Sequence, residues 1–333
     1  MLESGLFMIV AVVLLALSFD FVNGFHDTAN AIATSISTGA LTPRSGIILA
    51  SVMNLLGALS FTGVAETVGG RIINPLMLEN GLMVVMSALL AAIAWNLITW
   101  HFGLPSSSSH ALIGSLTGAA LMSAGFSAVN LKGYTEILKA LFFSPLAAFT
   151  AGLLLMYFIK VLILSRSLHK PDSQFRRLQV AAAAFQAFAH GTNDAQKTMG
   201  IIMLTLIMGG FLDSHRIPLW VKLSSATAIA LGTSMGGWKI IKTVGSKITR
   251  VAPANGFASD LSSALIIITA TIFKLPVSTT HVISSSIMGA GTAVSASAVN
   301  WGTAKKIILA WLVTLPASAV LAALSFMLLA RPE

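Results

Sequence analysis

Long apolar stretches follow one another along almost the whole chain, separated by short polar segments. A membrane-spanning helix needs about 20 consecutive apolar residues. On that basis we predict apolar helical segments over 5–22, 28–41, 46–65, 81–100, 106–125, 136–164, 178–190, 195–212, 219–235, 257–273, 277–298 and 304–330. The pattern predicts an all-α polytopic membrane protein with roughly 10–12 membrane segments.

Four of these segments are too short, or too rich in Ser and Gly, for an ordinary span: 28–41, 106–125, 178–190 and 277–298. We expect broken or re-entrant helices at these positions, because non-helical backbone at membrane depth is tolerated where it is buried in protein. Each of the four lies in or beside a conspicuously polar motif.

Two polar motifs occur twice, in the same order. NGFHDTANA over 23–31 aligns with HGTNDAQKT over 190–198, and LPSSSSH over 104–110 aligns with LPVSTTH over 275–281. The offset is 167 residues for the first pair and 171 for the second. Motifs that recur in order at nearly constant spacing indicate an internal duplication.

A third, weaker pair lies between them, ETVGGRI over 66–72 and KTVGSKI over 242–248. Duplicated membrane halves with broken helices at corresponding positions are typical of inverted-repeat secondary transporters, and this is the fold class that we predict. The expected parts are an N-terminal repeat, a basic cytoplasmic linker and a C-terminal repeat, over 1–165, 166–177 and 178–333.

The composition agrees with a membrane protein. Of the 333 residues, 56% are hydrophobic and only 9% are charged, whereas soluble domains carry about 25% charged residues. The mean hydropathy is +0.87. There is no Cys, which excludes a disulfide framework, a Cys-ligated zinc site and a thiol nucleophile. The net charge of +9 comes from basic residues scattered through short loops, so we expect no nucleic-acid partner.

The distribution of basic residues also predicts the orientation. Short cytoplasmic loops carry an excess of Lys and Arg, and RSLHKPDSQFRR at 166–177 is the most basic stretch. If each half crosses the membrane an odd number of times, both termini then lie outside. Lys305 and Lys306 suit a cytoplasmic start to the last segment.

Asp27 and Asp194 occupy equivalent places in the first pair of motifs. A charged Asp at the bilayer centre costs at least about 2.5–3.5 kcal/mol, and intramembrane ionisable residues are functional-site candidates by default. The structural alternative is that each Asp only caps a helix start. Capping alone does not explain the flanking Asn, His and Lys residues or the duplication.

The two Leu-Pro motifs place hydroxyl residues where helices are expected to start, since Pro favours the first turn of a helix. A helix N-terminus carries about half a positive charge and binds phosphate-like anions. Two such termini meeting from opposite halves would therefore cradle an oxyanion at the membrane midplane. The alternative is that these Ser and Thr residues serve helix packing, which fits single residues better than paired clusters.

Four of the seven His residues lie in the repeated motifs: His26, His110, His190 and His281. In the repeat alignment His26 faces Asn193 and His190 faces Asn23, so each half offers one His and one Asn in exchanged places. A transition-metal site is an alternative interpretation, although the motifs are richer in Asn, Ser and Thr than metal sites are.

At these motifs the chain resembles the inorganic phosphate transporter (PiT) family, in its bacterial low-affinity Pit branch, over essentially its whole length. The resemblance implies a secondary importer of inorganic phosphate in the plasma (inner) membrane, an inverted repeat and a homodimer. The family's phosphate and coupling-ion positions map to Asp27, Asn30, Asn193, Asp194, Ser107, Ser108, Ser109, Ser278, Thr279 and Thr280. The chemistry of the neighbouring residues adds Lys197 to the phosphate-binding candidates, and His26, His190 and Asn23 to the candidates for the coupling ion or proton.

The chain departs from the sodium-coupled members, which carry Asn where this chain has His26 and Lys197. Amide oxygens suit hard cations, whereas His and Lys bring a titratable group and a fixed cation. Phosphate carries between one and two negative charges, because its second pKa is roughly 6–7. With Asp27 and Asp194 the site therefore holds about −3 to −4, and Lys197 with two helix termini supplies only about +2. Protons, cations or a metal–phosphate complex must supply the rest.

We therefore predict proton-coupled phosphate symport, with co-transported H⁺ or Na⁺, or a divalent metal carried with phosphate, and no other cofactor. A cation held by Asp27 and Asp194, sodium coupling and sulfate transport are the alternatives within the family. An intramembrane hydrolase is disfavoured because every polar motif is duplicated and neither Ser cluster has a nucleophile-elbow pattern, so we expect no enzyme. An ion channel would differ by conductance in place of saturable, gradient-coupled flux.

Overall fold

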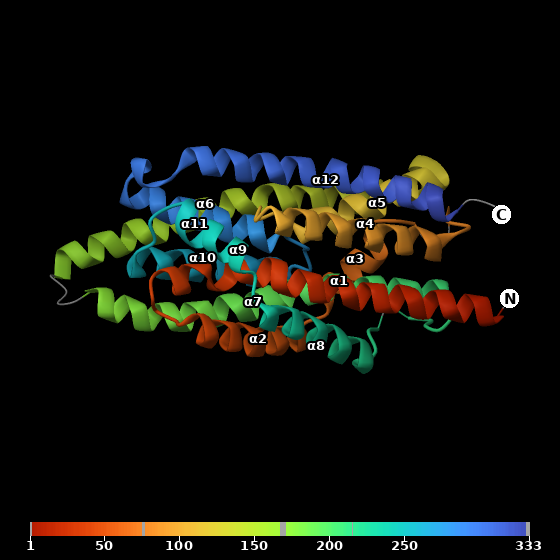
Figure 1. Ribbon diagram of the computed structural model, residues 1–333, viewed down its shortest axis with the longest axis horizontal. Coiled ribbons are helices and arrows are strands. Elements are labelled where there is room, and N and C mark those ends of the chain that lie inside the picture. Colours follow the sequence, from red (N-terminus) through yellow and green to blue (C-terminus); the bar gives the residue numbers. More distant parts are fainter. Residues whose placement is uncertain (1, 75–76, 167–170, 215, 331–333) are drawn as a thin grey trace.

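The computed structural model describes residues 2–74, 77–166, 171–214 and 216–330, and these ranges form an elongated bundle of helices (Figure 1). The helices are α1 (Leu2–Ser37), α2 (Pro43–Ser60), α3 (Gly63–Arg71), α4 (Gly81–His101), α5 (Ser108–Ala124), α6 (Leu131–Arg166), α7 (Pro171–Met208), α8 (Leu219–Met235), α9 (Trp238–Lys242), α10 (Pro253–Ile272), α11 (Thr279–Val294) and α12 (Trp301–Leu329). Short helical turns follow α5, α9 and α11, namely η2 (Gly125–Ala128), η3 (Thr243–Lys247) and η4 (Ala296–Ala298). The all-helical fold class predicted from the sequence is confirmed.

The order of elements in α1–α6 recurs in α7–α12. Each series has a long helix, a broken helix (α2–α3, or α8–α9 with η3), a hairpin (α4–α5 or α10–α11) and a second long helix (α6 or α12). Smaller features recur as well: an internal Pro lies in the last helix of each series, Pro145 in α6 and Pro316 in α12. The two series pack reciprocally, with α5 on α12 and α11 on α6, and with α2 on α7 and α8 on α1.

The two hairpins enter the bundle from opposite ends (Figure 1). The start of α1 and the end of α12 share one end of the molecule, here called the terminus end. The end of α6 and the start of α7 lie at the other, here called the linker end. The hairpin α4–α5 reaches inward from the terminus end and α10–α11 from the linker end. Each series therefore makes three passes and one re-entrant hairpin, the arrangement of an inverted repeat.

The Leu-Pro motifs end the hairpin turns, as predicted. α5 begins at Ser108, with Ser107 as N-cap accepting the His110 N–H at 3.1 Å. α11 begins at Thr279 in the same way, with Ser278 accepting the His281 N–H at 3.2 Å. At about 1.5 Å per residue, helices of 17 and 16 residues are too short to cross a hydrocarbon core of about 30 Å.

The predicted breaks at the other two motifs are wrong. α1 runs without interruption from Leu2 to Ser37, through NGFHDTANA. α7 likewise runs from Pro171 to Met208, through HGTNDAQKT. A helix satisfies its own backbone hydrogen bonds at membrane depth, so polar side chains require partners from other helices and not a break. This is why the expected segments 28–41 and 178–190 do not exist as separate elements.

By length and composition alone, six helical segments of the described residues could span a membrane, and a seventh span arises if the bent pair α2–α3, with its 70° angle, is counted as one. Three of the six are the long helices α1, α6 and α12, and the other three are the hairpin arms α4, α10 and α5 continued by η2. The polar α7 is not among them, because it carries much of the polar centre. Six passes and four hairpin arms make ten membrane segments in the described part of the chain, which lies within the predicted range of 10–12. The predicted linker lies partly outside the described residues, at 167–170, and its remainder is in α6 and α7. The repeat boundaries stay a prediction.

Close helix crossings at two glycines fix the depth of the polar motifs. Gly24 on α1 touches the backbone of α8 at Gly232, and a Cβ there would overlap backbone atoms. Gly57 on α2 does the same against α7 at Thr192. Small residues allow such close approach between membrane helices. The first crossing sets the position of α1 along α8 one turn before Asp27, and the second sets the position of α7 along α2 close to Asp194.

Candidate functional site

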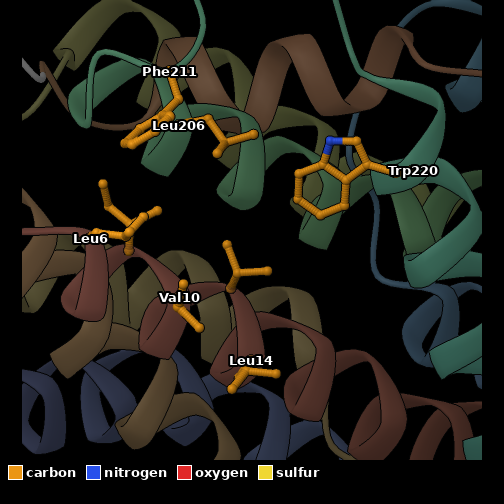
Figure 2. Close-up of a pocket in the computed structure, with 8 residues that line it drawn as sticks. Leu6, Val10, Leu14, Leu206, Phe211 and Trp220 are labelled. Carbon is orange, nitrogen blue, oxygen red and sulfur yellow. The ribbon is translucent and has the colours of Figure 1, made fainter. Parts of the chain in front are cut away.

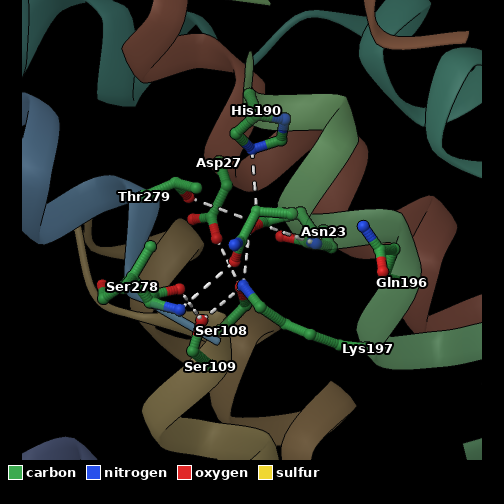
Figure 3. Close-up of polar contacts among 12 residues, drawn as sticks. Asn23, Asp27, Ser108, Ser109, His190, Gln196, Lys197, Ser278 and Thr279 are labelled. Carbon is green, nitrogen blue, oxygen red and sulfur yellow. Dashed lines mark hydrogen bonds and ion pairs between the residues drawn. The ribbon is translucent and has the colours of Figure 1, made fainter. Parts of the chain in front are cut away.

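Asp27 of α1 and Asp194 of α7 lie close to each other in the buried interior of the bundle, and Figure 3 shows Asp27 among its neighbours. One oxygen of each carboxylate and one nitrogen of His190 all lie within 4.8 Å of one another. All three side chains are buried. Two carboxylates at this separation repel each other strongly in a low-dielectric interior, so the groups around them decide whether the arrangement is stable.

Asp27 contacts side chains from both hairpins and from its neighbour in α1. Ser108, in the first turn of α5, donates to one carboxylate oxygen. Thr280, in the first turn of α11, donates to the other at 2.9 Å. His26 Nδ1 lies 2.7 Å from this second oxygen. The carboxylate therefore joins the tips of the two hairpins, which come from opposite halves of the sequence.

Asp194 is held by a cation and further donors. Lys197 Nζ lies 2.5 Å from one carboxylate oxygen. The other oxygen accepts from Asn23 Nδ2 and from Thr279 Oγ1, both at 3.2 Å, and has His190 Nε2 at 3.3 Å. Asn23 thus links α1 to the carboxylate of α7, as expected if the two motifs build one site.

Lys197 is a buried cation shared between the two halves. Besides Asp194 it donates to Ser109 Oγ at 2.6 Å, in the first turn of α5. Ser109 in turn donates to the Val277 carbonyl oxygen at 2.9 Å, next to the start of α11. The ammonium group therefore lies between the motif of α7 and the tips of both hairpins (Figure 3).

The N-terminal ends of α5 and α11 face each other. The rings of His110 and His281, each in its helix's first turn, have centroids 4.4 Å apart. His281 also stacks on Trp311 of α12 at 4.0 Å. The first N–H groups of a helix have no intrahelical acceptor, and the N-cap serine accepts one of them in each helix. The remaining N–H groups of the two first turns and two positive helix ends converge near Asp27 and Lys197.

The remaining predicted residues position the hairpins. Asn30 Nδ2 donates to Thr280 Oγ1 at 2.9 Å. Asn193 donates to Thr271 and to the Leu275 carbonyl oxygen, and its own amide oxygen accepts the Val277 N–H at 3.2 Å. It therefore fastens the α10–α11 turn and does not face Asp27 or Asp194 directly.

His26 performs the equivalent task at the α4–α5 turn. Its Nε2 lies 3.0 Å from Thr99 Oγ1, and Ser106 donates to the same hydroxyl at 2.8 Å. His26 and Asn193, which occupy equivalent repeat positions, thus each tie a long helix to the turn of the hairpin in its own half. His26 additionally contacts Asp27, so it combines this role with a place at the centre.

Every residue predicted from the sequence as a site candidate is buried, and most contact one another. Sequence reasoning missed Asn54 of α2, whose amide oxygen lies 2.8 Å from His190 Nδ1. It also missed Thr99. The available signal was a single Asn or Thr inside an otherwise apolar helix, since such residues in membrane helices pair with other polar groups.

The apolar groove near the terminus end is a different kind of feature (Figure 2). It has a volume of about 230 Å³ and is lined by side chains of α1, α7, α8 and the connection between α7 and α8. Its walls include Leu6, Val10, Leu206, Phe211 and Trp220. Such a surface suits a lipid chain and offers no polar group to hold an ion.

The central cluster can bind both an anion and a cation. Helix N-termini, hydroxyls and Lys197 are donors for an oxyanion. Asp27, His190 and Asp194 have the spacing of a cation site, and carboxylate oxygens are ligands for hard cations. Asn23 and Asn30 each keep a buried amide oxygen with no hydrogen-bond partner among the described residues.

In the described part of the chain, six passes, two re-entrant hairpins and a buried polar centre at the hairpin tips form the arrangement of an inverted-repeat secondary transporter in a multi-pass membrane protein. The chain belongs to the phosphate transporter family, whose sequence profile matches residues 23–322, so it is a transporter and not an enzyme. The resemblance to the PiT family seen in the motifs is thereby confirmed.

Two relatives and one solved structure illustrate the similarity. A probable low-affinity inorganic phosphate transporter of Bacillus subtilis is 55% identical over 325 residues, 97% of this chain and 98% of the relative. One of Rhizobium meliloti is 44% identical over 321 residues, 96% of each chain. The solved structure of a sodium-dependent phosphate transporter superposes with a TM-score of 0.84 at 25% identity, covering 97% of this chain and 98% of that one.

The buried pair of Lys197 and Asp194 gives a prediction about stability. In Lys197→Met the carboxylate loses its cation, and breaking a buried ion pair costs about 3–5 kcal/mol. We expect a clearly lower melting temperature for the purified protein in phosphate-free detergent solution. Adding Asp194→Asn to this variant should recover part of the loss.

Lys274→Met is the matched control, because Lys274 pairs with Glu66 at 2.9 Å with both side chains about half exposed. Exposed pairs contribute about 1 kcal/mol or less, so this variant should melt close to the unaltered protein. Equal losses in the two Lys variants would show that Lys197 and Asp194 do not depend on each other.

Proposed function

We propose that this protein imports inorganic phosphate across the plasma membrane by symport with protons, and that phosphate binds between the tips of the two hairpins. The observation that carries the proposal is the meeting of two helix N-termini with the two carboxylates of the repeated motifs. The names of the relatives support phosphate as the substrate. The phosphate ligands would be the hydroxyls of the two hairpin tips, Lys197 and Asn30.

The proposal assigns each group a task. The hydroxyls of Ser108, Thr279 and Thr280 donate to the two carboxylates, and that of Ser109 donates to a backbone carbonyl oxygen. All four O–H bonds can turn to phosphate oxygens instead. Ser107 and Ser278, the N-caps, keep the helix starts in shape and so act through them. The carboxylates then accept the O–H of phosphate, or hold the coupling cation.

Phosphate is favoured over sulfate by these carboxylates. Sulfate carries no proton at neutral pH and can only accept hydrogen bonds. Asp27 and Asp194 would therefore repel it and receive no hydrogen bond from it. Phosphate near neutral pH still carries a proton that it can donate to a carboxylate. Sulfate remains the nearest alternative substrate.

Protons are favoured over sodium by the cations already in place. Lys197 lies 2.5 Å from Asp194, where a sodium ion would otherwise bind. His26 and His190 each contact one of the carboxylates and can carry a proton into the site. The sodium-dependent relative of similar fold supports the sodium alternative. The cluster of Asp27, His190 and Asp194 supports a third reading, in which phosphate travels with a divalent metal.

The proposed orientation places the linker end in the cytoplasm and both termini outside. Starts of α7 and α12 lie at the linker end (Figure 1), and they carry Arg176, Arg177, Lys305 and Lys306. Basic residues favour the cytoplasmic side. The homodimer implied by the family resemblance stays a prediction.

The coupling ion can be tested in vesicles containing the purified protein. We expect an inward pH gradient to drive uptake of labelled phosphate in sodium-free buffer, because protons are needed to offset the charge of the occupied site. Imposing a sodium gradient at equal pH should add nothing. Uptake that requires sodium and ignores the pH gradient would rule out proton coupling and leave phosphate transport itself intact.

The two carboxylates give a second prediction in the same assay. Asp27→Asn and Asp194→Asn keep the side-chain size but remove the charge that joins the hairpin tips to α1 and α7. Each variant should lose transport by at least 100-fold, equivalent to about 2.7 kcal/mol, while Asp213→Asn, in an exposed connection, should transport normally. Normal uptake by either site variant would remove that carboxylate from the mechanism.

A further inference from the structure

A third carboxylate is buried close to the central cluster and takes no part in it. Asp20 lies on α1 seven residues before Asp27, two helical turns away and therefore on the same face, about 10 Å nearer the terminus end. Its side chain is completely buried. Neither carboxylate oxygen has a hydrogen-bond partner among the residues that the structure describes.

Two hydroxyl groups from other helices face this carboxylate. Thr198 of α7 and Ser225 of α8 lie next to the Asp20 carboxylate. Both are buried, and neither hydroxyl has a hydrogen-bond partner in the described part of the chain. Three helices thus bring three unpaired polar side chains to one place, where packing alone would favour apolar residues.

An unpaired ionised carboxylate is too costly to bury, so a group in this position takes up a proton or a cation. Hard metal ions need about six or more oxygen ligands, and only three side chains with four oxygens converge here. A single proton needs only one carboxylate oxygen to bind to, so four oxygens are enough. A neutral carboxylic acid donates one hydrogen bond and accepts others, and small rotations of the Thr198 and Ser225 hydroxyls meet those needs.

Charges on neighbouring helices connect this position to the central cluster. Asp194 and Lys197 of α7 are the charged groups that act on Asp20. On α8 the nearest charged residue is Lys222, which is partly exposed and lies one turn before Ser225. The titratable residue of α4 is His101, at the far end of that helix. An anion entering beside Lys197 therefore adds negative charge close to Asp20, and a proton bound at Asp20 would offset part of that charge.

Asp20 also breaks the internal symmetry. At the offset of the first motif pair its counterpart in the second half is Ala187, so the linker side of the cluster has no equivalent carboxylate at this position. A buried carboxylate on the linker side, Asp260 of α10, accepts hydrogen bonds from Thr34 and Ser35 of α1, whereas Asp20 has no hydrogen-bond partner among the described residues. This difference fits a task on the terminus side, such as the capture of protons from outside.

We propose that Asp20, with Thr198 and Ser225, is a proton-binding site that takes up one coupling proton from the outside as phosphate binds and releases it to the cytoplasm as phosphate leaves. This inference rests on the proposed function, since it names a residue that carries a coupling proton. Thr198 and Ser225 are positioning residues that stabilise the protonated acid.

The test compares the unaltered protein with Asp20→Asn, which resembles the protonated acid but cannot release a proton. Vesicles receive an inward gradient of one pH unit with the membrane potential held at zero, and the final ratio of internal to external phosphate is measured. Each coupled proton multiplies this ratio about tenfold per pH unit. We expect Asp20→Asn to accumulate about tenfold less phosphate than the unaltered protein, and the exposed control Asp213→Asn to match the latter.

An accumulation ratio is an equilibrium quantity, so a smaller amount of folded protein slows its approach without changing its value. An unchanged ratio in Asp20→Asn would overturn the inference while leaving proton coupling intact. An unaltered protein that ignores the pH gradient would instead overturn the proposed function. Should Asp20→Asn carry no phosphate at all, Asp20→Glu decides: restored accumulation supports a proton role, and continued inactivity contradicts it.

A sodium arm separates the two cations. The same vesicles receive a tenfold sodium gradient at equal pH. Suppose that the sodium gradient drives phosphate accumulation by the unaltered protein and that Asp20→Asn loses this accumulation. That result would assign the site to sodium and contradict the proton assignment.

Discussion

Burying two carboxylates beside each other at membrane depth is the constraint on which this structure depends. Asp27 and Asp194 are buried away from the protein surface, and their repulsion has to be offset by donors from elsewhere in the chain. The bundle supplies these donors from both hairpin tips, from Lys197 and from two His residues. The packing of the hairpins is therefore inseparable from the charge state of the centre, and any change in that charge is felt by the helices that would have to move.

The internal repeat explains how one site is built from two halves. Equivalent helices contribute equivalent carboxylates, and equivalent hairpins contribute equivalent N-termini from opposite ends of the molecule. The symmetry is broken where the chemistry requires it. Lys197 forms an ion pair with Asp194 and none with Asp27. His26 contacts Asp27, whereas its counterpart Asn193 contacts the hairpin turn and neither carboxylate. Two similar carboxylates thus receive different surroundings, so that one is permanently offset by a cation and the other depends on hydroxyl and imidazole donors.

The sequence predicted much of this, because its strongest signals are local. A Pro followed by Ser or Thr predicts a helix start, and both hairpin helices begin at those residues. Recurrence of the Asp motifs predicted that Asp27 and Asp194 share one place. The predicted breaks in α1 and α7 were wrong because a polar stretch in a membrane helix has two possible causes, a broken backbone or a buried polar face, and only the contacts across helices distinguish them.

Isolated residues were harder to predict for the same reason. Asn54 and Asp20 stand alone in apolar segments, so no spacing reveals that they face α7. Their neighbours on α7, His190 and Thr198, lie more than a hundred residues away in the sequence. The register of such helices is set by close contacts such as that of Gly24 with α8. Tertiary packing, which the local pattern does not encode, decides which single polar residues join a site.

The central claim is that a tetrahedral oxyanion binds between the two hairpin tips beside the paired carboxylates. A crystal structure with arsenate, a phosphate analogue whose arsenic atom scatters anomalously, tests it most directly. The account predicts one anomalous peak per chain within hydrogen-bonding reach of Lys197 and of hydroxyls from both tips, among them Ser109 and Thr279. A peak elsewhere, or none under conditions in which arsenate competes with phosphate for transport, would contradict it.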